Sequence, residues 1–591
     1  MSSNISTLHR LRRAVQTGAI YWLDPLFADR HPGEGLSKLI RTAGPAVRLL
    51  QPNDRWNLAA FIDDWARVLD EQPLQPLPPS KRIFTFGCYR GQFTRDLVLA
   101  FLLAWRGHHV TCGYLPKLRS PIKPPLADAE NVQSYLAEVL GKVGPLTRGR
   151  VTCIDMSAWR DKGGEIDEAF LASISRADTI MYTRREKLDL GVSEIGRTYA
   201  YFETIGRDAQ SAAMEFFARH GRDFDLAVIA NGASFENGHF CHAAKLSGVP
   251  VNTHEKFAFA NVIVVNHGDA FFHFKDLDRI WFRRDELGFM NEPTRTAVID
   301  KGWDLLNQRR GSTGRAWGWQ YQKGRTNRSP EDITRLLGVE RGKFALICPN
   351  VPFDAGYEGW LEIFPSMRDW LVETTRHLLE HHDIKIVARA HPAETRPGYG
   401  EEKLASLFAE AGISSDRLVV VPGDGDVNTY DLMPLCRFAA VFASTTGIEI
   451  AMHDKPVLAG ASVYYARCGI SLPASTKEQY FAALDRLAIG EETAPESLAD
   501  DAAMLYFMFH YLLQWRFPYD KPSQITATPP RKLVRSRDID VFAETLDVLA
   551  MTTEEFEAAL PRLVRADLID RRFGLAPYAA APPSSETEVP E

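Results

Sequence analysis

Three hydroxyl side chains follow one another at the end of an apolar run, at Ser444–Thr446. The run itself, Phe438–Ala443, has the composition of a buried strand, and the residues from Gly447 onward predict a helix. Hydroxyl groups and the free N–H groups of a helix's first turn suit an anionic phosphate. Glu449 in that turn could accept hydrogen bonds from the paired hydroxyls of a ribose. The same residues also fit a capping box, with Thr446 as N-cap and Glu449 three positions on, so a local structural role is equally open.

A histidine and a proline follow a second apolar run. The residues Ile384–Arg389 predict a strand, and His391-Pro392 comes directly after it, where the proline ends the strand and fixes a turn. An imidazole at the carboxyl end of a strand can donate to a phosphate or neutralise a leaving group. Arg389, two residues earlier, could add positive charge. Taken alone, His391-Pro392 is more simply explained as a plain turn.

The order of these segments along the chain is more specific than either segment alone. His391-Pro392 comes first, Asn428-Thr429 follows after one more helix and strand, and Ser-Thr-Thr-Gly-Ile-Glu (444–449) comes last. This order resembles the bacterial capsule polysaccharide synthesis glycosyltransferases, including the 3-deoxy-manno-octulosonic acid (Kdo) transferases of that group. It also resembles, more distantly, polysialyltransferases and the CDP-glycerol polymerising enzymes of teichoic acid synthesis. The resemblance covers roughly residues 340–475 and is only architectural over 80–290.

The resemblance implies a role for each matching position. The His-Pro motif would contact the phosphate of the donor nucleotide, the hydroxyl loop would bind phosphate, and Asn428 and Thr429 would line the nucleotide pocket. Glu449 matches the acidic residue on the helix after that loop. With Arg389 and Gly447 added, the predicted donor site comprises Arg389, His391, Pro392, Asn428, Thr429, Ser444, Thr445, Thr446, Gly447 and Glu449.

The general base has no matching motif, because the acidic motif of the sialyl-type relatives is absent from the first half of the chain. Sugar transfer needs a carboxylate or imidazole that takes the proton of the acceptor hydroxyl. Two segments that follow predicted strands offer such groups: Glu236, and the pair His254-Glu255. Glu236 also suits a helix cap, and His254-Glu255 also suits a turn. We place Glu255 first and Glu236 next, with His391 as the catalytic group on the donor side.

The elements that must position these residues alternate between strand and helix, which predicts parallel sheets. In the first half, strands are predicted at Arg82–Gly87, Gly107–Gly113, Arg150–Asp155, Asp225–Ala230 and Val249–Thr253. In the second half they are predicted at Phe344–Pro349, Ile384–Arg389, Leu418–Val421, Phe438–Ala443 and Pro456–Ala459, followed by helices over Thr476–Trp515. In such sheets ligands bind beyond the carboxyl ends of the strands.

The predicted fold is therefore α/β of the GT-B type, with two doubly wound Rossmann-like domains that face each other across a cleft and a helical N-terminal extension. The predicted divisions are 1–80 (extension and linker), 81–290 (acceptor domain), 291–340 (connecting segment), 341–495 (nucleotide-sugar domain), 496–575 (C-terminal helices) and 576–591 (disordered tail).

Composition excludes several classes of protein. Apolar residues make up 45% and charged residues 25% of the chain, as in globular proteins. The net charge of −7 lacks the basic excess with which proteins bind the phosphates of nucleic acids. The longest apolar run, Leu97–Trp105, is about half a membrane span. Seven dispersed cysteines and the lack of a secretory signal indicate a reducing compartment. We therefore expect a cytoplasmic protein, with peripheral association at the inner membrane face through a synthesis or export complex.

No metal and no cofactor are predicted. His239 and His242 share a helix face, and Glu380–Asp383 holds two more histidines, but neither segment shows a third ligand in the sequence. GT-B transferases commonly work without a bound metal, because helix dipoles and cationic side chains stabilise the leaving phosphate.

The predicted function is transfer of a sugar from a nucleotide-sugar to a capsule or other surface polysaccharide, with a glycan or lipid-linked glycan as acceptor. A CMP-activated acidic sugar is slightly favoured over a UDP-sugar as donor. Two alternatives stay open. One is a non-hydrolysing UDP-sugar 2-epimerase, which shares the two-lobed form, and the other is a non-catalytic subunit that binds a nucleotide or sugar.

Overall fold

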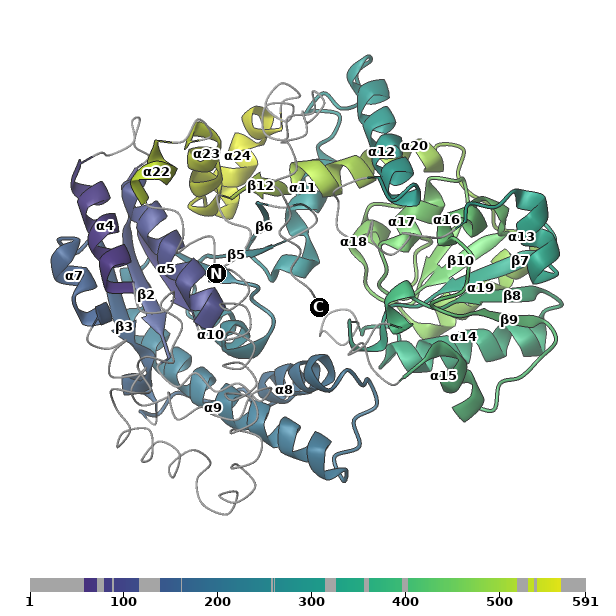
Figure 1. The fold of residues 1–591 in the computed structure, drawn as a ribbon, viewed down its shortest axis with the longest axis horizontal. Coiled ribbons are helices and arrows are strands. Elements are labelled where there is room, and N and C mark those ends of the chain that lie inside the picture. Colours follow the sequence, from purple (N-terminus) through teal and green to yellow (C-terminus); the bar gives the residue numbers. More distant parts are fainter. Residues whose placement is uncertain are drawn as a thin grey trace, which may run out of the picture.

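Two α/β units lie side by side in the chain's computed structural model (Figure 1). The structure describes residues 58–71, 79–87, 90–115, 139–160, 162–256, 259, 261–313, 326–354, 361–395, 402–517, 530–535 and 539–564. Of the predicted N-terminal extension, the described part is the helix α4 (Leu58–Glu71). The predicted tail, 576–591, lies outside the described residues.

The first unit is built on a seven-stranded sheet in the order β12-β6-β5-β4-β1-β2-β3. The strands are β1 (Arg82–Gly87), β2 (His109–Tyr114), β3 (Val151–Asp155), β4 (Leu226–Ala230), β5 (Val251–Lys256), β6 (Val262–His267) and β12 (Gln514–Arg516). Strands β1 to β5 run parallel, whereas β6 is antiparallel to β5 and β12 is antiparallel to β6. Strand order reverses between β1 and β4, so a ligand crevice is expected at their carboxyl ends.

The second unit has a five-stranded, fully parallel sheet in the order β11-β10-β7-β8-β9. Its strands are β7 (Phe344–Cys348), β8 (Lys385–Arg389), β9 (Leu418–Val421), β10 (Phe438–Val441) and β11 (Val457–Ala459). Every side chain of β7, β10 and β11 is buried, as expected for strands that are covered by helices on both faces. Here the strand order reverses between β7 and β10.

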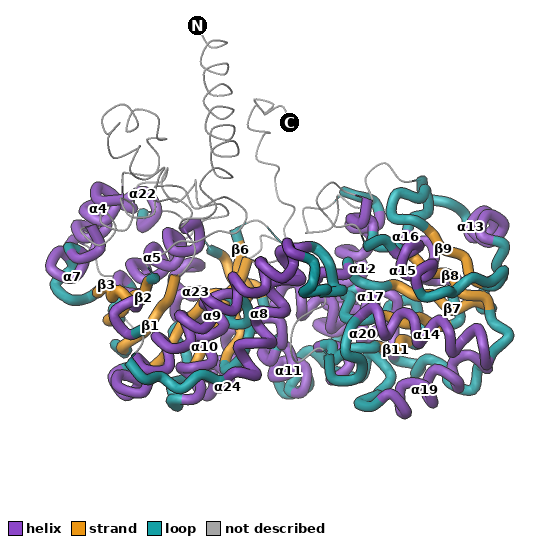
Figure 2. Tube along the Cα trace, turned by 90° about the horizontal axis from the view of Figure 1, so that it is seen from below, coloured by secondary structure: helices purple, strands orange, loops and turns teal. Residues whose placement is uncertain are grey.

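Helices cover both faces of each sheet, as Figure 2 shows from a second direction. The helices of the first unit are α5 (Arg90–Trp105), α7 (Val143–Leu146), α8 (Glu168–Thr183), α9 (Ser193–His220), α10 (Phe235–Leu246), α11 (Lys275–Phe282), α22 (Pro530–Val534), α23 (Ile539–Leu549) and α24 (Thr553–Leu563). Those packed on or next to the second sheet are α12 (Thr294–Arg310), α13 (Pro330–Leu337), α14 (Met367–His381), α15 (Leu404–Glu410), α16 (Thr429–Leu432), α17 (Thr446–Ala451), α18 (Tyr464–Arg467), α19 (Lys477–Ile489) and α20 (Leu498–Phe507).

The alternation of side chains along β1 explains the two helical layers of the first unit. Phe84 and Phe86 point into a core that includes Phe216 and Phe240, from α9 and α10. Ile83, one position earlier, belongs to the opposite core, with the apolar residues of α5. Successive strand residues face opposite sides of a sheet, so one short run supplies both hydrophobic layers. The prediction of two Rossmann-like domains in a GT-B arrangement is confirmed.

The C-terminal part of the chain corrects one predicted element. The helix expected through Trp515 ends earlier, because α20 passes into a π-helical turn, Met508–Leu512, and then into the strand β12. This strand pairs with β6, itself a strand that the sequence analysis did not name. Pairing with an open sheet edge overrides the local helical pattern. Residues 496–575 thus contribute to both units, since α20 packs on α12 and α17 while α24 contacts the first unit through Glu555 and Lys81.

A carboxylate of the first unit joins the two units. The Glu186 side chain, just beyond α8, accepts hydrogen bonds from the backbone N–H groups of Met367 and Arg368 at the start of α14, at 2.6 and 3.0 Å. A second contact runs in the opposite direction, because the Glu402 carboxylate accepts a hydrogen bond from the backbone N–H of Glu186 at 2.7 Å. Nearby, Arg184 stacks over the ring of Phe353, 4.1 Å from its centroid. No helix in the described residues is long and apolar enough to cross a membrane.

Glu186→Gln should flatten the pH dependence of stability. Burial raises the pKa of Glu186 to about 7, although the backbone N–H groups of Met367 and Arg368 lower it. A carboxyl group with a raised pKa in the folded protein contributes its full stability at acid pH. That contribution is lost as the pH rises from the ordinary carboxyl pKa to about 7, and the free energy of unfolding falls by up to about 3 kcal/mol. We expect wild-type stability to fall relative to Glu186→Gln as pH rises from 4.5 to 8. Thermal unfolding of both proteins across this range tests it, and parallel curves would contradict it.

Candidate active site

A small pocket lies at the carboxyl ends of β7 and β8 in the second unit. Its volume is about 70 Å³. It is lined by Arg309, Cys348, Pro349, Arg389, Ala390, His391, Pro392, Thr429, Tyr430, Met433, Thr446 and Glu449. Pockets that hold a drug-sized ligand measure roughly 300–1,000 Å³. The pocket therefore has room for a phosphate-sized group rather than for a whole nucleotide-sugar.

Arg389 is the most buried charged side chain of this pocket, with 2% of its surface exposed. Its Nε donates to the hydroxyl of Thr429 at 3.3 Å, and Nη1 donates to the carbonyl of Pro422, where β9 ends. These bonds hold the guanidinium in place at the edge of the sheet. Arginine cannot lose its proton in a protein, so this position carries a fixed positive charge.

His391 is oriented by its own backbone turn. The backbone N–H of Ala393 donates to Nδ1 of the imidazole at 3.1 Å, in the short 3₁₀ turn Pro392–Thr395. A neutral imidazole that accepts at Nδ1 carries its proton on Nε2. The turn predicted at His391-Pro392 is present, and it sets the tautomer whose Nε2 can donate to an anion.

Glu449 takes part in a buried hydrogen-bond network of the second unit. Its Oε1 accepts from Arg309 at 2.7 Å, from the Tyr506 hydroxyl at 2.8 Å and from the Tyr430 hydroxyl at 3.3 Å. The carboxylate is buried, with 4% of the side chain exposed. It lines the pocket but its Oε1 is occupied by this network. The capping box does not form either, since the N-cap of α17 is Thr445, without a side-chain cap bond.

The hydroxyl loop, Ser444–Thr446, is held by hydrogen bonds within the loop and by a hydrogen bond from Tyr465. Ser444 Oγ accepts from the backbone N–H of Thr446 at 3.2 Å and donates to its Oγ1 at 3.0 Å. The Tyr465 hydroxyl donates to the Ser444 carbonyl at 2.7 Å, and a Cβ on Gly447 would lie 2.3 Å from that hydroxyl. Gly447 is therefore required by packing. Thr446 lines the pocket, whereas Ser444 and Thr445 do not.

Asn428 caps α16 and does not line this pocket. Its Oδ1 accepts from the backbone N–H of Tyr430 and caps α16, while its Nδ2 bonds the Arg310 carbonyl at 3.4 Å and Asn327 Oδ1 at 3.0 Å. It is 1% exposed and does not line the pocket, whereas Thr429 does. Asn428 thus fastens the connecting segment to the second unit.

Arg309, from the last turn of α12, is the charged pocket residue that was not predicted from the sequence. Burial lowers its pKa, but the neighbouring Glu449, Tyr430 and Tyr506 raise it more, so that the pKa of the guanidinium lies well above its ordinary value. Its Nη1 bonds Glu449 and Tyr506, while its buried Nε has no partner in the described residues. The only sequence signal was the basic character of the segment around it.

The predicted base Glu255 lies within β5, not in a loop after it, because the strand runs to Lys256. Its Oε2 accepts from Asn231 Nδ2 at 3.3 Å, and its Oε1 is 3.7 Å from Arg95 Nη2. The side chain is 20% exposed. Asn231 follows β4 with a positive φ of 63°, which aims the β4–α10 loop across the end of β5. Glu255 thus sits at the carboxyl edge of the first sheet.

A buried pair, Asp96 and His254, lies beside Glu255, and Asp96 was not predicted from the sequence. Asp96 Oδ1 is 3.9 Å from His254 Nε2, and both side chains are buried. Neither Asp96 oxygen nor His254 Nε2 has a hydrogen-bond partner in the described residues. Burial raises the pKa of Asp96 to about 7, and burial lowers the pKa of His254 well below its ordinary value. The signal for Asp96 was a lone acid in the apolar helix α5.

Glu236 lies in the first turn of α10, half-buried. Its neighbour Phe235 donates its backbone N–H to Asp178 Oδ2 at 2.9 Å, so that α8 supplies the carboxylate at this helix start. Asp178 is buried, and burial raises its pKa well above the ordinary value, with Glu236 raising it further. Glu236 therefore follows β4, and Glu255 lies near the end of β5, which pairs with β4 in the same sheet.

A larger cavity of about 590 Å³ lies at the opposite edge of the first sheet. Arg82, His109 and Asp223, at the amino ends of β1, β2 and β4, are among the residues that line it. Ligands of doubly wound sheets bind at the carboxyl ends. We therefore place the chemistry at the smaller pocket, where the charged side chains converge.

Comparison with known proteins gives distant structural likenesses. No protein-family model matches the chain, and no protein of curated function matches its sequence. A KpsC β-Kdo 2,4 transferase of Thermosulfurimonas dismutans is 13% identical, with a TM-score of 0.30, and the match covers 48% of this chain and 79% of that one. A UDP-GlcNAc 2-epimerase of Neisseria meningitidis, bound to UDP-GlcNAc, is 10% identical, with a TM-score of 0.23 over 77% and 100% of the two chains.

A third solved structure is S. aureus MnaA with UDP, 12% identical, with a TM-score of 0.23 over 74% of this chain and 99% of that one. TM-scores and identities this low carry no conclusion about activity. The fold and the pocket by themselves define a GT-B-like α/β protein with a cationic pocket in its second unit.

Arg309→Met should destabilise the second unit. The substitution leaves the Glu449 carboxylate buried without its cation, which typically costs about 3–5 kcal/mol. Arg309→Met combined with Glu449→Gln should cost less than Arg309→Met alone, because both charges are removed together. Urea unfolding followed by circular dichroism measures both. A single-variant loss under about 1 kcal/mol would show that Arg309 does not hold the buried charge.

Proposed function

We propose that the chain is a glycosyltransferase that moves a sugar from a nucleotide-sugar to a saccharide acceptor, with the donor held by the second unit. The observation that carries this proposal is the convergence of Arg309, Arg389 and His391 on one phosphate-sized pocket. These side chains bring positive charge and an N–H donor to the carboxyl ends of β7 and β8. A leaving phosphate gains negative charge as the sugar departs, and preorganised cations and donors stabilise that charge.

In the proposed reaction the acceptor hydroxyl attacks the anomeric carbon of the donor sugar. The bond between that carbon and the phosphate oxygen breaks, and the phosphate leaves with the bonding electrons. His391, with its proton on Nε2, donates a hydrogen bond to the phosphate, while Arg389 and Arg309 balance its charge. The acceptor proton passes to a carboxylate of the first unit. No cofactor takes part, since the nucleotide-sugar is itself the donor substrate.

The preference between donors rests on the sequence resemblance to the Kdo transferases of capsule synthesis. We therefore place a CMP-activated acidic sugar first and a UDP-sugar second.

The acceptor side of the proposal rests on the sequence resemblance. The order of the His-Pro and Ser-Thr-Thr-Gly-Ile-Glu segments resembles capsule polysaccharide glycosyltransferases, so we propose a capsule or other surface glycan as acceptor. Such work takes place at the cytoplasmic face of the inner membrane. The protein would then associate peripherally with the synthesis or export machinery.

A second candidate function is supported by the first unit. Asp96, His254 and Glu255 gather acid and histidine groups at one sheet edge, as proton transfer at a hexose carbon would require. A UDP-sugar 2-epimerase therefore stays as the alternative. Incubation with a single nucleotide-sugar and no acceptor separates the two functions, because an epimerase forms an isomeric nucleotide-sugar without any second substrate.

Nucleotide binding should depend on Arg389. We expect CMP, CDP, UDP or GDP to raise the unfolding temperature of wild type, by the equivalent of about 2.7 kcal/mol at 100 times the dissociation constant. Arg389→Met should abolish the shift. The matched control is Arg417→Met, since Arg417 also donates to backbone carbonyls of the second unit but does not line the pocket. No shift with any nucleotide in wild type would refute the donor site.

Glu255→Gln should lower kcat by roughly 10²–10⁴ without changing nucleotide binding, because the lost group acts only as a general base. Glu236→Gln is the matched comparison, in the first turn of α10, the helix that follows the neighbouring strand β4. Initial rates of sugar transfer and the thermal shift with nucleotide are measured for both. If Glu236→Gln has the larger effect, the base is Glu236; equal, small effects would exclude both carboxylates.

A further inference from the structure

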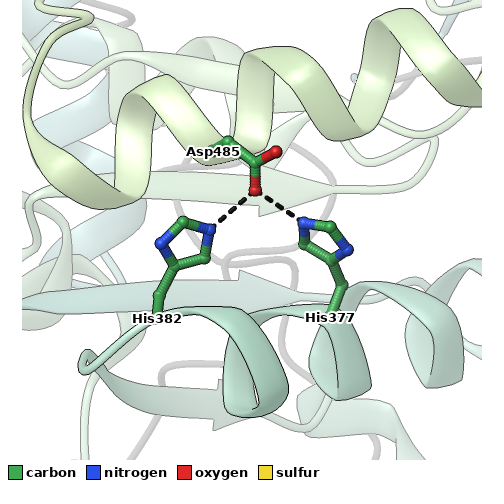
Figure 3. A group of neighbouring side chains, drawn as sticks. All are labelled: His377, His382 and Asp485. Atoms are coloured by element: carbon green, nitrogen blue, oxygen red, sulfur yellow. Dashed lines mark hydrogen bonds and ion pairs between the residues drawn. The ribbon is translucent and has the colours of Figure 1, made fainter.

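Two histidines and an aspartate converge on the surface of the second unit, away from the pocket. His377 Nε2 and His382 Nε2 each lie 2.6 Å from Asp485 Oδ1, and Figure 3 shows the two rings facing that oxygen. The three ligand atoms all lie within 4.8 Å of one another. Within the described residues, this is the one group of three His, Cys, Asp or Glu side chains so arranged.

The end of α14 brings the two imidazoles together. Residues five apart on a continuous helix point in different directions, since each residue turns by 100°. Here α14 ends at His381, and His382 adopts an extended conformation, with φ −131° and ψ 144°. The backbone N–H of His382 still bonds the Leu378 carbonyl at 3.1 Å, so the turn is closed. This break returns the ring of His382 to the side of His377.

The third ligand comes from a separate helix that is held in fixed register with α14. Trp370 Nε1 donates to the Tyr480 hydroxyl at 2.7 Å, and Lys477 Nζ is 2.7 Å from Glu373 Oε1. These contacts lie on the turns before the cluster, and the following turn of α19 carries Asp485. The ligands therefore stand on two rigid elements, which preorganises a site.

Aromatic contacts fix the ring of His377. The ring stacks with His381, with centroids 4.4 Å apart, and lies tilted against the ring of Phe481, with centroids 4.6 Å apart. Burial raises the pKa of Asp485, but hydrogen bonds from His377 and His382 lower it more, so the pKa lies below its ordinary value. The same two hydrogen bonds hold Oδ1 of Asp485 between the imidazole rings.

We propose that His377, His382 and Asp485 form a zinc-binding site. Zinc takes imidazole nitrogens at about 2.0–2.1 Å and carboxylate oxygens at about 2.0–2.2 Å, in a tetrahedral arrangement. Around such an ion the three ligand atoms would stand about 3.3 Å apart, so each Nε2–Oδ1 distance has to lengthen by roughly 0.7 Å from its present 2.6 Å. The proton of each imidazole moves from Nε2 to Nδ1, and water fills the fourth position.

The position of this site, away from the anion pocket, favours a role in holding two helices together. It lies where α14 leads into β8, at the amino edge of the second sheet, whereas the anion pocket lies at the carboxyl edge. The C-terminal end of a helix also carries partial negative charge, which favours a cation. Zinc would fasten α14 to α19, and the opposite end of α14 receives the Glu186 carboxylate of the first unit. The inference is independent of the proposed transferase activity.

Metal titration of the full chain tests the site. Protein stripped with a chelator is titrated with Zn²⁺ against a chromophoric chelator, and with Co²⁺ for the visible bands of a tetrahedral ion. We expect one ion per chain and a higher unfolding temperature with Zn²⁺. His377→Ala, His382→Ala and Asp485→Asn should each weaken binding by at least about 10-fold, a loss known even for outer-shell variants.

The matched control is His381→Ala, which removes an exposed neighbouring imidazole whose Nδ1 bonds the His377 carbonyl and which is outside the group of three. It should bind zinc within a few-fold of wild type, and circular dichroism checks that every variant is folded. Absence of stoichiometric binding to wild type would overturn the proposal. So would equal affinities for Asp485→Asn, His377→Ala and wild type, which would place the ion elsewhere.

Discussion

The buried contact between Arg309 and Glu449 brings together four segments that are far apart in the sequence. Arg309 comes from α12, Glu449 from α17, and the tyrosine hydroxyls that complete the network come from α16 and α20. Burying two charges costs several kcal/mol for each ion unless hydrogen bonds and the partner charge replace the lost water. The tyrosines supply those bonds. The pocket therefore exists only when the connecting helix, the second sheet and the C-terminal helices are all in place.

Opposite demands meet in this pocket. An anionic ligand needs positive charge, yet a protein interior does not tolerate several uncompensated cations. Glu449 balances Arg309, and backbone carbonyls at the end of β9 hold Arg389 without neutralising it. The result is a lining with more positive than negative charge and little freedom to rearrange. A ligand that brings its own negative charge then meets donors that are already oriented, which is the condition for strong electrostatic stabilisation.

Local sequence patterns predicted the strands that carry the site. They did not predict the site residues that come from distant segments of the chain. The runs that form β7 and β10 are fully apolar, and β8 has an apolar centre between Lys385 and Arg389, so these strands and the position of His391 after β8 could be predicted. Arg309 was not, because nothing in a basic helix shows which arginine turns inward. Asp96 had a weak signal, as a lone acid among apolar residues. Asp485 joins His377 only through the packing of α19 on α14, and Glu449 followed a long-range partner rather than its local capping pattern.

The pairing of β12 with β6 links the order of synthesis to the order of folding. As the chain leaves the ribosome, β6 emerges early and presents an open sheet edge, while Gln514–Arg516 emerges only after the whole second sheet has been made. Unpaired edges invite pairing with other chains. The first unit therefore gains its last strand only after the second half of the chain has been made. Two domains that fold independently in the order of synthesis would not have this dependence.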